Sequence, residues 1–331
     1  GEMARGRDRA SGDYNDFWAD RDFMNDLDGI QAPTLMAHAF NDWNVVPEHS
    51  VRVYEYLKAK GVPVQAYYHQ GGHGGQPPME LMNRWFTRYL YGVENGVEND
   101  PRAWIVREGD DPSQPTPYAD YPNPDAVDVT LHPLAAEVLD GRVGIGGLAA
   151  TALPGQGTQT LVDNVSFGGD ALAQAEWTTH RLLYATPELT RPVHISGMPR
   201  ITVRLASSKP AANLSVWLVS LPWTDRGSLT DNLITRGWAD PQNHDSLRQG
   251  EPLEPGRFYD VTFDLEPDDQ VVRAGQRIGL MIFSSDRDFT LWPQPGTELT
   301  VDLDGTSLVL PVVGGGAALE EAVTTTDGGD R

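Results

Sequence analysis

Residues 32–47 read A-P-T-L-M-A-H-A-F-N-D-W-N-V-V-P, and residues 62–75 read V-P-V-Q-A-Y-Y-H-Q-G-G-H-G-G. The apolar run Pro33 to Phe40 ends at Asn41-Asp42. A second apolar and aromatic run, Val62 to Tyr68, leads into the glycines that surround His73. Between these runs, Val46 to Lys60 has apolar residues at helical spacing. The pattern predicts strand, acid, helix, strand and histidine, with both polar groups at strand ends, where open α/β sheets carry function.

Helix signals support this order of elements. Pro47 suits the first position of the predicted helix, and Gly61 suits the position after its end. Pro78 opens a second helix, and Gly92 ends it. The apolar residues that share one face of that second helix are Met79, Met82, Trp85, Phe86, Tyr89 and Leu90. A shorter aromatic helix is expected within 14–23. The β-α-β-α alternation predicts parallel strands with helices packed across them.

After residue 100 the pattern changes to short runs rich in Val, Ile, Leu and Thr. The expected strands are Trp104–Val106, Thr158–Val162, Arg181–Ala185, Arg200–Ala206, Asn213–Ser220, Phe258–Leu265, Arg277–Ser284 and Leu299–Leu303. Asp304-Gly305 predicts a hairpin turn. Residues 112–124 are expected to form a surface loop, and residues 314–331 are expected to form a frayed tail. Many strands without intervening helices predict a β-sandwich or jelly roll. We therefore expect one domain over residues 1–100 and a jelly-roll β-sandwich over 101–331.

Composition excludes several classes of function. The 331 residues carry 25 Lys plus Arg and 47 Asp plus Glu, a formal net charge of −22, so nucleic acid and anionic membranes are unfavourable partners. The absence of cysteine excludes disulfides, thiolate metal sites and a cysteine nucleophile. No apolar run approaches the roughly 20 residues that span a bilayer. A soluble protein is expected, and both the cytoplasm and secretion remain open as its compartment.

The candidate catalytic residues are Asp42 and His73. A histidine that acts as general base needs a carboxylate to hold its tautomer and to stabilise the imidazolium. The glycines on both sides of His73 make a flexible loop, which does not suit a histidine packed in the core. The H-x-x-x-H spacing of His69 and His73 could suggest zinc, but the segment is a strand followed by glycines rather than a helix. His38 is expected in the core or beside the site. No metal or cofactor is therefore predicted.

A serine nucleophile elbow, G-x-S-x-G, does not occur in the sequence. Ser11 and Ser196 are each followed directly by glycine, but neither has glycine two residues before it. The strands that should precede the Asp42 strand in a hydrolase sheet are also not found. We therefore expect these residues to be the C-terminal part of a longer protein, and we expect this chain alone to be inactive.

The motifs Y-N-D-F-W-A-D-R-D-F, A-P-T-L-M-A-H-A-F-N-D-W-N-V and G-G-H-G-G resemble the catalytic domain of the Xaa-Pro dipeptidyl-peptidase family. Those serine peptidases have the α/β-hydrolase fold and are related to cocaine esterase and the α-amino-acid ester hydrolases. H-I-S-G-M-P-R-I-T-V-R-L, L-I-T-R-G-W-A-D-P-Q-N and G-Q-R-I-G-L-M-I-F-S-S-D resemble the family's C-terminal jelly roll. The resemblance covers nearly the whole chain and implies an α/β-hydrolase C-terminal part followed by that domain.

The resemblance implies that Asp42 orients the imidazole and that His73 is the general base and later acid. It implies hydrolysis that releases N-terminal Xaa-Pro dipeptides without a cofactor, with a proline-containing peptide and the missing N-terminal half as partners. A homo-oligomer is left open. Two alternatives remain: ester or amide hydrolysis of the cocaine esterase type, and a catalytically inactive chain whose jelly roll binds a ligand.

Overall fold

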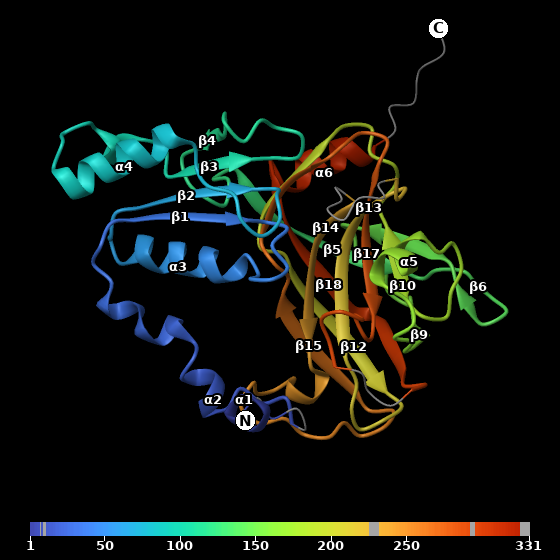
Figure 1. Ribbon diagram of the computed structural model, residues 1–331. Helices are drawn as coiled ribbons and strands as arrows, with labels where there is room; N and C mark the ends of the chain where they lie inside the picture. Colours follow the sequence, from blue (N-terminus) through green and yellow to red (C-terminus); the bar gives the residue numbers. More distant parts are fainter. Residues whose placement is uncertain (7, 9–10, 225–231, 292–294, 325–331) are drawn as a thin grey trace, which may run out of the picture.

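The computed structural model describes residues 1–6, 8, 11–224, 232–291 and 295–324. Within them, a small sheet flanked by helices lies beside a larger β-rich part (Figure 1). The chain begins with α1 (Glu2–Gly6), α2 (Asp16–Ala19) and the 3-10 helix η1 (Phe23–Gly29), which pass from the β-rich part to the small sheet. The aromatic helix expected within 14–23 is therefore a single turn, α2, followed by the 3-10 helix.

The small sheet has the order β1-β2-β3-β4. Its strands are β1 (Thr34–Ala39), β2 (Val64–His69), β3 (Ala103–Val106) and β4 (Thr116–Tyr118). The first three are parallel, and β4 is antiparallel to β3. α3 (Glu48–Ala59) connects β1 to β2, and α4 (Met79–Tyr91) with the 3-10 helix η2 (Val97–Asn99) connects β2 to β3. The predicted β-α-β-α order is confirmed, although β4 lies inside the stretch expected to be a loop, and the sheet extends beyond residue 100.

Helix α3 forms where its sequence places apolar residues three apart. Val51, Tyr54 and Leu57 are buried in one cluster with residues of β1 and β2. Pro47 caps the helix rather than occupying its first turn, and Gly61 follows the end with φ +76. That left-handed conformation is accessible to glycine at little cost. The packing of α3 across the sheet fixes the connection between the two strand ends that matter for the site.

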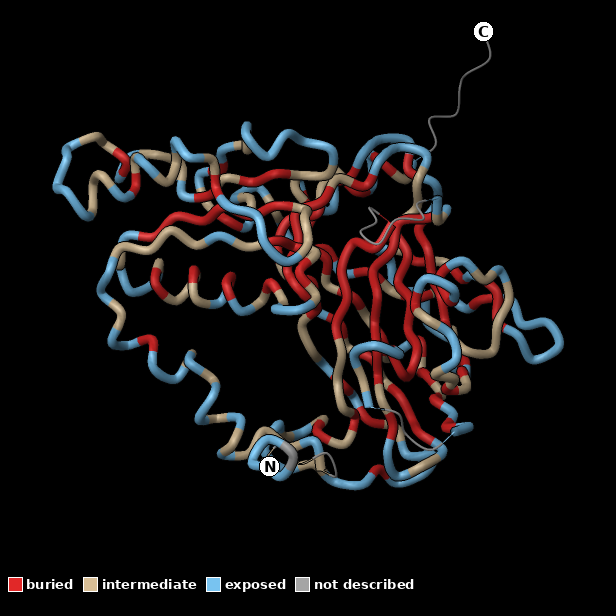
Figure 2. The backbone as a smooth tube through the Cα atoms, viewed as in Figure 1, coloured by how far each residue is buried: buried red, intermediate tan, exposed pale blue. Residues whose placement is uncertain are grey.

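Helix α4 differs from its expected packing. Of its apolar residues only Trp85 is buried, whereas Met79 and Leu90 are 70% and 71% exposed. Figure 2 shows α4 as a largely exposed and half-buried edge of the molecule. The apolar stripe predicted for this helix therefore has no covering element among the described residues.

The β-rich part contains a twelve-stranded sheet in which most neighbours are antiparallel. Its strands are β5 (Ala126–Leu134), β8 (Ile145–Ala149), β9 (Thr158–Val162), β10 (Leu182–Ala185), β11 (Val193–Gly197), β12 (Arg200–Ser207), β13 (Leu214–Leu221), β14 (Leu233–Ala239), β15 (Phe258–Asp264), β16 (Asp268–Val272), β17 (Arg277–Phe283) and β18 (Glu298–Val313). A hairpin, β6 (Val138–Leu139) and β7 (Arg142–Val143), α5 (Gly169–Gln174) and the 3-10 helix η3 (Pro241–Asn243) complete it. Strands from across the sheet bury side chains in one hydrophobic core. The jelly-roll connectivity stays a prediction.

Two expectations for the end of the chain are wrong. Asp304-Gly305 is not a hairpin turn, because β18 continues through it to Val313. The strand bulges there against β12, and the Asp304 carboxylate accepts the amides of residues 155–157 at 2.8 to 3.1 Å. The expected frayed tail contains α6 (Gly315–Val323), whose Leu319 and Ala322 are buried in the core. Residues 325–331 of that predicted tail lie outside the described residues.

No helix in the described ranges is both long and apolar enough to cross a membrane.

Candidate active site

The structure brings Asp42 and His73 together at the carboxyl ends of β1 and β2. The two strands are parallel and in register up to the pair Ala39 and His69, so the loops that follow them start side by side. His73 Nδ1 lies 2.8 Å from Asp42 Oδ2. Asp42 is 4% exposed, whereas the His73 side chain is 63% exposed. One imidazole nitrogen thus contacts the buried carboxylate, while most of the ring is accessible from outside.

The Asp42 carboxylate is held on both oxygens. Its Oδ1 accepts the backbone amides of Asn44 and Val45, each at 3.0 Å. Burial raises the pKa of Asp42, but the hydrogen bonds from the Val45 amide and from His73 outweigh burial, so its pKa lies below the ordinary value. The group is therefore an anion at neutral pH, as an acceptor for an imidazole N–H requires. His38 Nε2 lies 3.4 Å from Asp42 Oδ2 and 2.8 Å from the Val45 carbonyl, which places His38 beside the site as expected.

The glycine loop is shaped by His69, the last residue of β2. A Cβ at Gly71 would lie 2.7 Å from His69 Nδ1, and a Cβ at Gly75 would lie 2.5 Å from Nε2. His69 is 8% exposed, and its Nδ1 accepts the Gly71 amide at 3.1 Å. Burial lowers the pKa of His69, which favours the neutral imidazole. Two of these glycines thus allow close approach to a buried ring, a role that the sequence did not reveal.

No group of three or more His, Cys, Asp or Glu in the described ranges is arranged to hold a metal ion. His69 Nδ1 accepts the Gly71 amide, and His73 Nδ1 contacts the Asp42 carboxylate. Ser196 is fully buried, and its hydroxyl accepts the Asn123 amide at 2.9 Å. The described residues therefore present an acid and an imidazole, and they do not present Ser196 as a nucleophile.

Several contacts from the β-rich part reach the loops that carry Asp42 and His73. The Arg236 guanidinium lies 3.6 Å from the ring centroid of Trp43, the residue after Asp42. Glu266 contacts the start of α3, and Asp268 contacts Gln70. Sequence analysis missed these contacts because the partners are about 200 residues apart, and the only signal was that Arg236 lies in a motif shared with the family.

Two family descriptions match this chain. Residues 95–329 match the X-Pro dipeptidyl-peptidase C-terminal non-catalytic domain, and residues 2–75 match the X-Pro dipeptidyl-peptidase (S15 family). The chain belongs to the X-Pro dipeptidyl-peptidase family. The segment with Asp42 and His73 thus falls in the match to the S15 family, and Arg236, Glu266 and Asp268 fall in the match to the non-catalytic domain.

Among curated members of the X-Pro dipeptidyl-peptidase family, a putative Xaa-Pro dipeptidyl-peptidase of Rhodopirellula baltica is 61% identical over 321 residues, which cover 96% of this chain and 50% of the relative. An Xaa-Pro dipeptidyl-peptidase of Lactobacillus delbrueckii subsp. lactis is 28% identical, with 93% of this chain and 44% of the relative covered. The chain therefore spans about half the length of the curated relatives it matches.

Solved structures share the fold at low identity. An aminopeptidase from a marine sediment archaeon of the Thaumarchaeota matches with a TM-score of 0.69 and 16% identity, covering 94% of this chain and 61% of that one. An α-amino acid ester hydrolase matches with a TM-score of 0.68 and 16% identity, covering 94% and 60%. This chain of the X-Pro dipeptidyl-peptidase family thus has an architecture found in α/β-hydrolase-related enzymes.

Proposed function

We propose that this chain supplies the acid and the base of a serine hydrolase, most specifically an Xaa-Pro dipeptidyl-peptidase that releases N-terminal Xaa-Pro dipeptides. The observation that carries the proposal is the 2.8 Å contact between buried Asp42 and exposed His73 at adjacent strand ends. The nucleophile would come from outside these 331 residues. The sequence lacks a G-x-S-x-G, and the chain spans about half of its curated relatives.

In this mechanism the Nδ1–H of His73 donates to Asp42, which leaves the lone pair of Nε2 as the base. Nε2 takes the proton of the serine hydroxyl while the serine oxygen attacks the carbonyl carbon of the substrate's proline. The resulting imidazolium is stabilised by the Asp42 anion and then gives its proton to the leaving amine. A water molecule repeats the sequence and releases the dipeptide, so that the histidine ends as it began.

In the described part of the chain, the edge strand β1 and the exposed apolar residues of α4 support a preceding segment. β1 lies at the edge of the sheet order, and α4 exposes apolar side chains. An open edge and an uncovered apolar helix face are both surfaces that proteins normally cover. The remaining hydrolase strands would extend the sheet beyond β1, and this is where the proposal places the missing half of the catalytic domain.

A second candidate function is ester hydrolysis. The same acid and base serve both reactions, and an α-amino acid ester hydrolase shares the fold. The leaving group and the pocket decide between them, and the pocket depends on the segment outside this chain. Xaa-Pro peptides are favoured because the curated relatives carry that name.

The test is a substrate panel applied to the protein extended by its preceding segment. Gly-Pro p-nitroanilide, Gly-Ala p-nitroanilide and phenylglycine methyl ester would be compared by kcat/KM. The proposal expects the first to be hydrolysed best and this chain alone to be inactive, because a serine nucleophile and its partners contribute on the order of 10⁶-fold in rate. Preference for the ester would favour the second candidate, and no hydrolysis at all would support the inactive alternative.

A further inference from the structure

We infer that residues 266–269, Glu-Pro-Asp-Asp, position the two loops that carry Asp42 and His73, through Gln70. This segment runs from the turn after β15 into the first residues of β16, and it lies in the part that matches a non-catalytic domain. The inference rests on the proposed function, since it treats Asp42 and His73 as the working pair. It makes the β-rich part a positioning element of the active site rather than an appended module.

Gln70 connects the β-rich part to both loops. It directly follows β2 and precedes the glycines before His73. Its Nε2 donates to Asp268 Oδ1 at 2.8 Å and to the Asp269 carbonyl at 2.9 Å. Its Oε1 and its backbone carbonyl accept from Asn41 Nδ2 at 3.0 and 2.9 Å, and Asn41 is the residue before Asp42. One side-chain amide therefore joins the start of each loop to a fixed point on β16.

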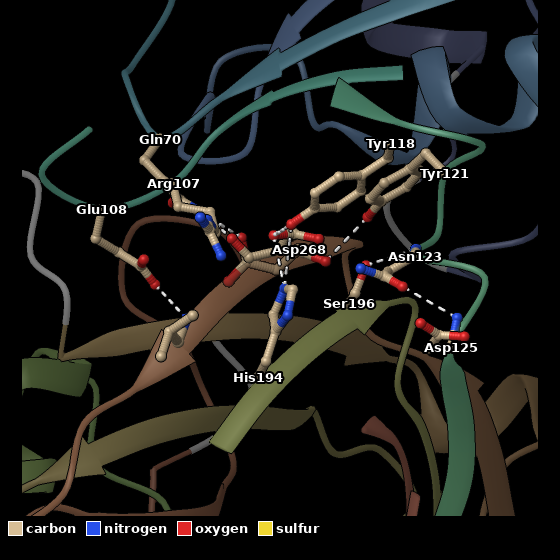
Figure 3. Close-up of polar contacts among 12 residues, drawn as sticks. Gln70, Arg107, Glu108, Tyr118, Tyr121, Asn123, Asp125, His194, Ser196 and Asp268 are labelled. Atoms are coloured by element: carbon tan, nitrogen blue, oxygen red, sulfur yellow. Dashed lines mark hydrogen bonds and ion pairs between the residues drawn. The ribbon is translucent and has the colours of Figure 1, made fainter. Parts of the chain in front are cut away.

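The fixed point is buried and polar. Asp268 and Asp269 are 1% and 0% exposed. Tyr121 donates its hydroxyl to the Asp268 carbonyl at 3.0 Å, and Tyr118 donates to Asp269 Oδ1 at 3.0 Å. His194 Nε2 lies 2.9 Å from the same oxygen. Figure 3 shows Gln70, Tyr118, Tyr121 and His194 converging on Asp268 and its neighbours from separate elements.

The burial of the Asp268 carboxyl lowers the stability of the fold, so packing alone does not explain its position. Burial, together with nearby Glu108 and Asp269, raises its pKa well above the ordinary value, against the hydrogen bond from Gln70. Oδ2 of Asp268 and Oδ2 of Asp269 are buried without a hydrogen-bond partner in the described structure. A buried carboxyl with an unsatisfied oxygen lowers stability. This cost is explained if the oxygen facing Gln70 serves the loop geometry.

The same segment also holds the far end of the Asp42 loop. Glu266 Oε2 accepts the backbone amide of Glu48, the first residue of α3, at 3.0 Å. Glu266 is 8% exposed. The loop from Asp42 to Glu48 is thus fixed at its start through Asn41 and Gln70 and at its end through Glu266. Both anchors belong to residues 266–269.

The experiment replaces Gln70 by methionine in the protein extended by its preceding segment. Methionine keeps the approximate volume and removes both polar atoms. We expect kcat to fall by about tenfold or more, with KM changed by less than about threefold, because binding groups are untouched while the base is misplaced. By NMR, the strongly deshielded proton shared by His73 and Asp42 should broaden or disappear, because it exchanges faster with water once the loop is released.

The matched control is Gln65→Met. Gln65 lies on β2, the strand that Gln70 follows, and is 4% exposed. Its Nε2 donates to the Val97 carbonyl at 3.3 Å, away from both loops. It should lose stability as Gln70→Met does but keep kcat and the deshielded proton. Asp268→Asn keeps an acceptor for Gln70 and should keep kcat, whereas Asp268→Leu should behave like Gln70→Met.

The inference is overturned if Gln70→Met folds and keeps both kcat and the deshielded proton, or if Gln65→Met loses both to the same degree. The NMR signal separates this inference from the proposed function. If the wild-type protein shows the shared proton but hydrolyses nothing in the panel, the proposed function fails. The loss of the proton in Gln70→Met would then still establish the positioning role.

Discussion

Replacing Asp42 by asparagine removes one charge and leaves the shape of the side chain unchanged. In the structure Oδ1 is held by the amides of Asn44 and Val45, which can only donate. The asparagine must therefore keep its oxygen at that position and turn its NH₂ toward His73. Nδ1 of His73 then has to accept a hydrogen bond, so the ring proton moves to Nε2. The nitrogen that should take the serine proton is blocked.

The expected loss is about 10⁴ in kcat/KM, the size that the wrong tautomer costs in other triads. The assay is hydrolysis of Gly-Pro p-nitroanilide by the protein extended by its preceding segment, with folding checked by thermal melts. The control is Asp100→Asn, since Asp100 pairs with Arg84 at 2.8 to 2.9 Å outside the site. A partly exposed ion pair contributes little, so kcat/KM should stay within about twofold.

A loss of less than about tenfold in folded Asp42→Asn would refute the tautomer argument. So would an equal loss in Asp100→Asn, because the effect would then come from general destabilisation. Retention of activity with a shifted pH profile would mean that another group orients His73. His38 Nε2, at 3.4 Å from Asp42 Oδ2, would then be the first residue to replace.

Three further predictions concern stability. Gly75→Ala should lower the free energy of unfolding by about 2 kcal/mol in a urea titration, because φ is +91 and the new Cβ would lie 2.5 Å from His69 Nε2. Burial raises the pKa of Glu266 to about 7, so the folded state keeps a proton on this carboxyl that the unfolded state has lost. The free energy of unfolding should therefore fall as the pH rises from about 4.5 to 7, by on the order of 3 kcal/mol. Glu266→Gln should flatten that fall in thermal melts across this pH range. Arg181→Met should cost about 3 kcal/mol or more, because the buried guanidinium donates to backbone carbonyls including those of Val143 and Gly144; an unchanged melting temperature would contradict this.

The β1-α3-β2 unit of the small sheet could be predicted because its signals are local. Pro33 to Phe40 and the helix before Gly61 carry their own periodicity, and the order of strands in a β-α-β unit follows from chain connectivity. Asp42 and His73 could be paired for the same reason, since parallel neighbours place their carboxyl ends together. Their 2.8 Å contact is thus a consequence of a pattern visible in the sequence.

Other features depend on contacts that the sequence does not display. Asp304-Gly305 has the composition of a turn, yet the Asp304 carboxylate bonds three amides of a distant loop and the strand continues past it. The apolar face of α4 predicts burial, and its partner is not among the described residues. The contact of Gln70 with Asp268 joins residues 198 positions apart and follows from the docking of two parts.

The most direct test of the account is fluorophosphonate labelling of the extended protein, compared between wild type and His73→Ala. The probe forms a covalent bond with a serine whose proton is taken by a base. The account predicts rapid labelling of one serine outside residues 1–331, and a rate reduced by about 10³-fold or more in His73→Ala with the fold intact. Labelling of a serine within residues 1–331, or an unchanged labelling rate in His73→Ala, would contradict it.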